Sequence, residues 1–260
     1  MQEEYQRAWV GLVIEALVIS ILSNIVFGAS IGSVSCKYTL SYSPSNAAFL
    51  IWILVYSTAF FSVFFQLVGT LYFQIDDENS YADYRSNLFF ALAWFFASLW
   101  VPVFTLDEKW SHVLSATLLC LCSSFSLAAM VVDGPWAGKG RVKWANATAF
   151  SLLAGWTLTA STLSLGIAYR ALYNSENLDK CDDLESDYNL MNTLDTSRAN
   201  FPVPLILAIP VALLSVWMSN PIFPLPLAWA IFFMHYTHFN FLAFVILIGS
   251  SVNASIQIYM

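Results

Sequence analysis

Long apolar stretches with almost no charge constrain this chain more than any other feature. A bilayer core about 30 Å thick takes about 20 apolar residues of helix. Seven stretches have this character: residues 9–31, 47–73, 87–105, 111–132, 147–169, 203–218 and 222–249. They lack the alternation of a β-barrel strand, and only 10% of the 260 residues are charged, against about a quarter in a soluble domain. The sequence therefore predicts an all-α, polytopic transmembrane helical bundle.

We expect seven spans, with six as the alternative, because Pro202, Pro204 and Pro210 make the sixth short and irregular. Pro221 separates the sixth span from the seventh. Basic residues are split five against five between the two sides of a seven-span arrangement, so the orientation stays open. The N-terminus resembles neither a signal peptide nor a transit peptide, so we expect targeting through internal helices. We predict a multi-pass protein of an organellar, mitochondrial, membrane.

The second span begins with an unusual aromatic pattern. Pro44 precedes it and suits the first turn of a helix. Phe49, Trp52 and Tyr56 then recur at spacings of three and four residues, so they share one helix face. From the residues alone, this face can be a lipid anchor, a helix-packing seam or the wall of a ligand pocket.

Two motifs resemble the tryptophan-rich sensory protein family, also called the translocator protein or TspO-like family. The first joins the first loop to the second helix and consists of Pro44, Ala48, Phe49, Ile51, Trp52 and Tyr56. The second lies in the fifth helix and consists of Phe150, Ser151, Leu152, Gly155, Trp156 and Ala160. The family's proline, tyrosine and asparagine of that helix are replaced by Ala149, Leu153 and Ser164. Trp229-Ala230 lies where longer members, which have two extra helices, often show the same pair.

The resemblance implies three parts: a five-helix membrane core (1–170), an acidic extramembrane loop (171–201) and a C-terminal two-helix extension (202–260). It also implies a pocket near the first loop that takes a tetrapyrrole, a sterol or a lipid. The residues expected to line it are Pro44, Phe49, Trp52, Tyr56 and Trp156. Apolar walls with aromatic rings suit a flat hydrophobic ligand, and helix packing is the competing reading of the same residues.

A few polar side chains lie inside the predicted spans, where such groups are expensive and usually face protein. Glu15 falls about six residues inside the first span, and we expect it to find a donor on a neighbouring helix. His235 and His238 fall near the middle of the seventh span and share a face, and Asn240 follows them in the same span. We expect both histidines to form hydrogen bonds within protein and to bind no metal, since no nearby Cys or carboxylate completes a ligand set.

No sequence pattern indicates an enzyme or a resident cofactor; a bound lipid or tetrapyrrole is the ligand considered. Cys120 and Cys122 are expected as core residues. Cys36 and Cys181 lie in loops on one side, and whether they form a disulfide is open, because it depends on an oxidising compartment.

The acidic segment 176–195 is expected to contact a partner, because long structureless connections are usually functional or disordered. The residues we assign to that contact are Asp182, Asp183, Glu185, Asp187 and Tyr188. Membrane lipids and other membrane-protein subunits are the expected partners, and acidic loops argue against nucleic acid. The sequence thus supports a non-catalytic accessory or scaffold subunit of a larger organellar membrane complex, with a binding protein or sensor for a hydrophobic ligand as the alternative.

Overall fold

A computed structural model of the protein describes residues 2–38, 40, 43–72, 84–134, 141–173, 203–234 and 238–259. Across these ranges all regular structure is helical. In chain order the helices are α1 (Gln2–Lys37), the 3-10 helix η1 (Asn46–Leu50), α2 (Ile51–Tyr72), α3 (Tyr84–Phe104), α4 (Lys109–Asp133), α5 (Arg141–Tyr173), α7 (Val203–Trp217), α8 (Leu225–Phe232) and α9 (His238–Tyr259).

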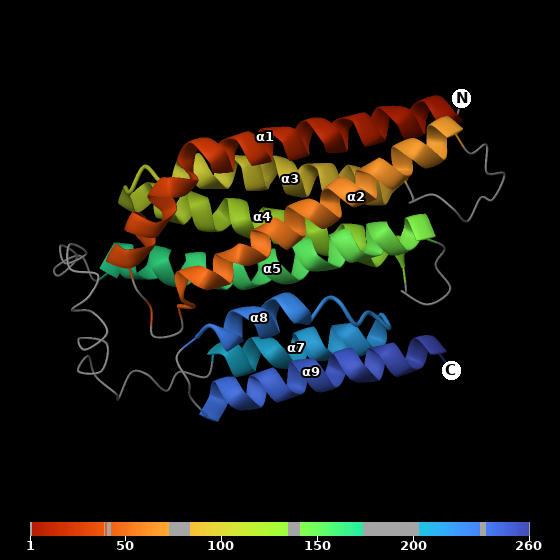
Figure 1. The fold of residues 1–260 in the computed structure, drawn as a ribbon. Coiled ribbons are helices and arrows are strands. Elements are labelled where there is room, and N and C mark those ends of the chain that lie inside the picture. The colour runs from red at the N-terminus through yellow and green to blue at the C-terminus, as the bar shows by residue number, and fades with distance from the viewer. Residues whose placement is uncertain are drawn as a thin grey trace.

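The helices form two groups that lie side by side (Figure 1). Helices α1 to α5 make one bundle, with α1 and α3 packed together at one edge and α5 at the other. Helices α7, α8 and α9 pack on each other, and α8 makes the contact with α5. The N- and C-termini lie at the same end of the molecule (Figure 1).

Six of the described helices are long and apolar enough to cross a membrane: α1, α2, α3, α4, α5 and α9. The protein is therefore a polytopic, multi-pass membrane protein, as the sequence predicts. Helix α7 is shorter, with 15 residues.

The predicted seventh span, 222–249, is wrong in its bounds. Instead of one helix the chain forms α8 and α9, and α9 continues to Tyr259. Helix α8 begins at Leu225, with Pro224 as its N-terminal cap and Pro226 in its first turn, where a missing amide donor is tolerated. Its end tightens into i→i−3 hydrogen bonds, from the Phe233 and Met234 amides to the Ala230 and Ile231 carbonyls. An apolar run therefore contained a helix break that hydropathy alone does not mark.

Pro44 does not occupy the first turn of the second helix. Ser45 is the N-terminal cap of η1, with extended backbone dihedrals, and α2 proper begins at Ile51. Pro44 thus ends the loop, consistent with its fixed φ and missing amide donor, but the helix starts later than predicted.

The centre of the first bundle is filled with large aromatic side chains. Trp94, Trp156, Phe90 and Phe150 are all fully buried. The Phe90 and Phe150 ring centroids are 4.6 Å apart, which joins α3 to α5.

Helix α8 approaches α5 at Gly155. A Cβ atom placed on this glycine would lie 2.4 Å from the Phe223 carbonyl oxygen and 3.0 Å from a Pro226 side-chain carbon. No other residue type fits there without moving the backbone of the turn before α8. Asn220, also buried, donates from Nδ2 to the Ser151 hydroxyl of α5 at 2.6 Å and accepts from the Ile222 and Phe223 amides. The C-terminal helices are thus fixed to α5 by close packing and by hydrogen bonds.

A chain of buried amide groups joins α2, α3 and α5 near one end of the bundle. The Asn87 Nδ2 donates to Gln66 Oε1 at 2.9 Å, and the Gln66 Nε2 donates to Asn146 Oδ1 at 2.9 Å. The Ser62 hydroxyl donates to the same Asn146 oxygen at 2.5 Å. Hydrogen bonds of this kind specify which helix faces meet, because apolar side chains pack about as well against lipid as against another helix.

Candidate functional site

Four of the five residues predicted to line a ligand pocket come together inside the bundle. Trp52 points inward, with its ring centroid 6.2 Å from that of Trp156 and 5.4 Å from that of Tyr56. Phe49 makes an edge contact with Trp156 at 5.9 Å. The spacing of three and four residues places Phe49, Trp52 and Tyr56 on one face, and α5 supplies Trp156 opposite. Pro44 is half-buried at the start of this region.

Two tryptophans of α3 complete this group, and neither was predicted from the sequence. Trp100 stacks on Trp52 with centroids 6.5 Å apart, and Trp94 stacks on Tyr56 at 5.1 Å. Their spacing of six residues does not mark a single helix face, so the sequence offered no clear signal. We call Phe49, Trp52, Tyr56, Trp94, Trp100 and Trp156 the aromatic cluster.

The rings of the aromatic cluster contact one another directly. Aromatic pairs in contact have centroids about 4.5–7 Å apart, and every pair described above falls in that range. A flat ligand stacked between two of these rings would have to separate them.

Three indole N–H groups of the cluster are buried with no hydrogen-bond acceptor among the described residues: those of Trp94, Trp100 and Trp156. A buried donor without an acceptor is costly and calls for an explanation. A hydrogen-bond acceptor on a bound ligand would satisfy these three donors.

The Tyr56 hydroxyl, in contrast, is engaged by α1. It accepts a hydrogen bond from Asn24 Nδ2 at 2.7 Å and lies 3.1 Å from the Ser20 hydroxyl. On the same helix, the Ser23 hydroxyl donates to the Ser98 carbonyl of α3 at 2.7 Å. The polar side chains of α1 therefore hold α1 to α2 and α3.

The C-terminal helices cover the start of the second helix, where the resemblance places the mouth of the pocket. The Trp229 indole N–H donates to the Ala48 carbonyl at 2.9 Å, and the Ser45 amide donates to the Phe233 carbonyl at 2.9 Å. Both bonds connect η1 and its cap to α8 or the residue that follows it. Access to the aromatic cluster from this side requires α8 to move.

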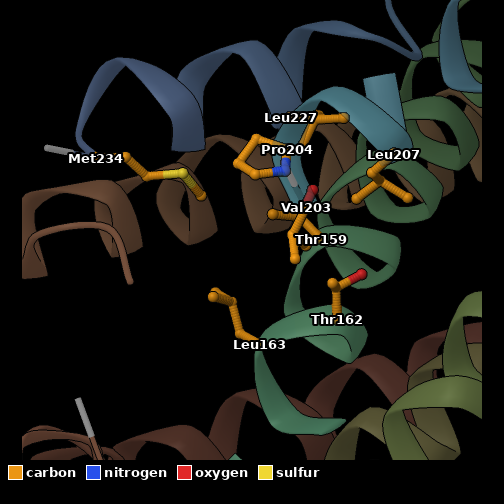
Figure 2. A pocket seen from close by; sticks show the side chains of 8 residues that line it. All are labelled: Thr159, Thr162, Leu163, Val203, Pro204, Leu207, Leu227 and Met234. Carbon is orange, nitrogen blue, oxygen red and sulfur yellow. The ribbon is translucent and has the colours of Figure 1, made fainter. Parts of the chain in front are cut away.

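A separate apolar hollow lies between α5, α7 and α8 (Figure 2). Its lining residues are Thr159, Thr162, Leu163, Val203, Pro204, Leu207, Leu227 and Met234. The hydroxyls of Thr159 and Thr162 both donate to carbonyls of their own helix, at Gly155 and Leu158. The hollow thus presents no free polar group from these two threonines, and none of the five predicted ligand residues lines it.

A cluster of charged and aromatic side chains lies at the end of the bundle where α3 is connected to α4. Asp107 forms an ion pair with Lys37 at the end of α1, and its other carboxylate oxygen lies 3.3 Å from the His112 Nε2. Asp107 has a positive φ of 54°. Tyr38 packs on the His112 ring with centroids 4.6 Å apart. Burial, and next the Asp107 carboxylate, raise the pKa of Tyr38.

The predicted polar residues of the spans do not gather into one site. Glu15 is exposed on the outside of α1, so a donor for its carboxyl on a neighbouring helix stays a prediction. His238 is exposed at the first turn of α9 rather than in the middle of a span, because the helix begins there, whereas Asn240 is buried.

Several predicted residues cannot be compared with the structure. His235, Cys181 and the acidic residues Asp182, Asp183, Glu185 and Asp187, with Tyr188, lie outside the described residues. The side chain of Cys36 is likewise not described. Cys122 is buried and Cys120 partly buried, and both are free thiols. The described residues contain no group of three or more His, Cys, Asp or Glu side chains that could hold a metal ion.

Comparison with known proteins bears directly on the resemblance. The family model described as TSPO-like protein matches residues 7–177, which is more than half of the chain. No curated protein matches the chain, and neither does any solved structure. The match begins within α1, extends past the end of α5 and stops before α7. The chain therefore belongs to the TSPO-like family of membrane proteins.

Proposed function

We propose that this protein is a non-catalytic scaffold, an accessory subunit of a larger complex in an organellar membrane. The observation that carries the proposal is the closure of the aromatic cluster. Its rings already contact one another. The start of the second helix is covered by two hydrogen bonds, from the Trp229 indole N–H to the Ala48 carbonyl and from the Ser45 amide to the Phe233 carbonyl. A region filled by its own side chains contributes packing energy and rigidity rather than binding.

The outer faces of the molecule support the same proposal. In α1 only 28% of the most apolar window is buried, and in α9 only 22%, against 72% in α5. Helices at both edges thus offer wide apolar surfaces to lipid or to other subunits. A rigid bundle with free edges suits a protein that fills space between larger partners.

Native gel electrophoresis of gently solubilised membranes tests the proposal. We expect the full chain to migrate with an assembly several times larger than its own 29.1 kDa. Migration of all the protein as a monomer or dimer, after solubilisation that leaves other membrane complexes intact, would refute it. Subcellular fractionation of the same membranes checks the mitochondrial location that we propose.

A binding protein for a hydrophobic ligand is the second candidate, favoured by the three unpartnered indole N–H groups. A tetrapyrrole or sterol with hydrogen-bond acceptors would satisfy them. Titration of the purified protein with a porphyrin and with a sterol tests this candidate. The Trp52→Ala, Trp156→Ala double variant should weaken binding, whereas Trp217→Ala, a change at an exposed residue of α7, should not. Equal binding by all three proteins would exclude the cluster as the site.

A further inference from the structure

Glu15 is the one charged side chain deep inside the described membrane spans. Each of the other charged residues in the six spans lies within three residues of a span end; they are Arg85, Lys109, Asp133, Lys143 and Arg170. Glu15 lies seven residues from the nearer end of its span, Ala8–Ser35. Ionisable groups at such positions are rare and usually functional.

The register between α1 and α3 shows how deep Glu15 lies. The Trp9 and Tyr84 rings are 6.4 Å apart, and Ser23 bonds to Ser98; in both pairs the residues are 75 positions apart. The two helices therefore run in parallel, with Glu15 level with Phe90. Trp and Tyr mark membrane interfaces, so Glu15 lies about 9 Å inside the Trp9–Tyr84 level at 1.5 Å per residue.

Glu15 faces outward, on an apolar stripe. Leu12, Glu15, Ile19, Leu22 and Val26 follow the three- and four-residue spacing of one helix face, and all are exposed. We call these five residues the α1 outer face. The polar side chains of Asn24 and Ser23 on α1 donate their hydrogen bonds to Tyr56 and to the Ser98 carbonyl, and not to the carboxylate.

We propose that the α1 outer face binds a transmembrane helix of another subunit, and that this helix carries a Lys or Arg side chain at the depth of Glu15. The inference deepens the scaffold function proposed above and rests on it. Charge complementarity selects this occupant, because an uncompensated carboxylate in lipid is costly and a cation on a facing helix offsets that cost. Gly11 lies one turn from Glu15 with nothing within 4 Å of its Cβ position, so a second helix can approach closely beside the carboxylate.

A second copy of this chain fits the same face less well. A two-fold dimer through parallel α1 helices would bring two Glu15 side chains to the same depth. Like charges there repel instead of compensating each other. The geometry therefore points to a heterologous partner.

The pairing can be measured with the full chain and two defined probes. The protein, labelled with a donor fluorophore at its N-terminus, is reconstituted in phosphatidylcholine vesicles. One probe is an acceptor-labelled Leu/Ala transmembrane peptide with a single Lys about 9 Å inside the interface; the other has Leu at that position. We expect energy transfer to the Lys peptide above the level of random encounters. Association should be about five- to thirty-fold weaker for the wild-type protein with the Leu peptide, and for Glu15→Gln with the Lys peptide. This is the range expected for one polar contact between helices.

Charge reversal separates a specific pair from general attraction. Glu15→Lys should bind a Glu-bearing peptide and reject the Lys peptide, and the double variant Glu15→Leu, Ile19→Glu should prefer a peptide whose Lys is moved by one turn. Equal transfer from every protein to every peptide would overturn the proposal. Strong transfer between differently labelled copies of the protein, lost in Glu15→Gln, would assign the face to a second copy and overturn it too.

Native gels of the source membranes distinguish this inference from the function on which it rests. If the wild-type chain migrates alone, the scaffold function fails. If it migrates in a large assembly and Glu15→Lys does so equally, the scaffold function stands and the assignment of the α1 outer face is wrong. Loss of the assembly in Glu15→Lys, with the monomer still folded, is the expected result.

Discussion

Replacing Gln66 with leucine tests whether the buried amide chain holds α2, α3 and α5 together. The change keeps the side-chain volume similar but removes the hydrogen bonds to Asn87 and Asn146, each 2.9 Å long. Asn146 Oδ1 keeps its bond from Ser62, whereas the Asn87 amide loses its partner, and its Oδ1 has none among the described residues. A stranded buried amide costs about 1–3 kcal/mol and a lost hydrogen bond about 0.5–1.5 kcal/mol. We therefore expect the free energy of unfolding to fall by about 1.5–4.5 kcal/mol.

Unfolding in mixed detergent micelles, followed by tryptophan fluorescence, gives this quantity. Thr58→Val is the matched control on α2, because the Thr58 hydroxyl donates only to carbonyls of its own helix, at Leu54 and Val55. It should change the stability by less than about 0.5 kcal/mol. The double variant Gln66→Leu, Asn87→Leu should be more stable than the sum of the single changes predicts, since it removes the stranded amide. Gln66→Leu as stable as Thr58→Val, with additive double effects, would refute the reasoning.

Four further changes test other parts of the protein. Gly155→Ala should lower the free energy of unfolding by about 1–3 kcal/mol, because its Cβ would meet the Phe223 carbonyl at 2.4 Å; Gly249→Ala, which has open space, is the thermal-unfolding control. Asp107→Asn should lower the pKa of Tyr38, since the carboxylate is one of the groups that raise it; absorbance titration of the phenol measures this. The raised pKa of Tyr38 means that its contribution to stability is present below pH 10.0, its ordinary value, and is lost as the pH rises through the folded-state pKa; Tyr38→Phe should flatten that slope. Replacing the acidic segment 176–195 by a Gly/Ser linker should leave the bundle folded and release the protein from its assembly on native gels, and an unchanged assembly would show that the segment is only a tether.

The sequence predicted those features that depend on local patterns. Hydropathy located α1 to α5, apart from their ends, because the bilayer sets their length, but it merged α8 and α9 into one span. The spacing of Phe49, Trp52 and Tyr56 predicted that they share one face, since helix geometry alone decides that. In each case the physical cause acts within a single helix.

Features that depend on a second helix were not predictable. The stacking of Trp94 on Tyr56 and of Trp100 on Trp52 arises from how α3 packs in the bundle, which no spacing within α3 encodes. The outward orientation of Glu15 likewise depends on which face of α1 meets α3. The break after α8 was missed because its apolar residues continue up to the point where the helix tightens.

The fifth-helix motif shows why a retained family signature does not establish a retained ligand. Gly155 and Trp156 match the family pattern, and the resemblance assigns Trp156 to a pocket. In this structure Gly155 provides the space in which the Phe223 carbonyl approaches α5, so the glycine is required by the C-terminal helices that lie beyond the family match. Trp156, the next residue, is fully buried against Phe49 and Trp52. Packing of the added helices is thus sufficient to explain Gly155, and contact with the rings of α2 explains Trp156. Only the unpartnered indole N–H groups remain for a ligand to explain, and the porphyrin and sterol titrations address those groups directly.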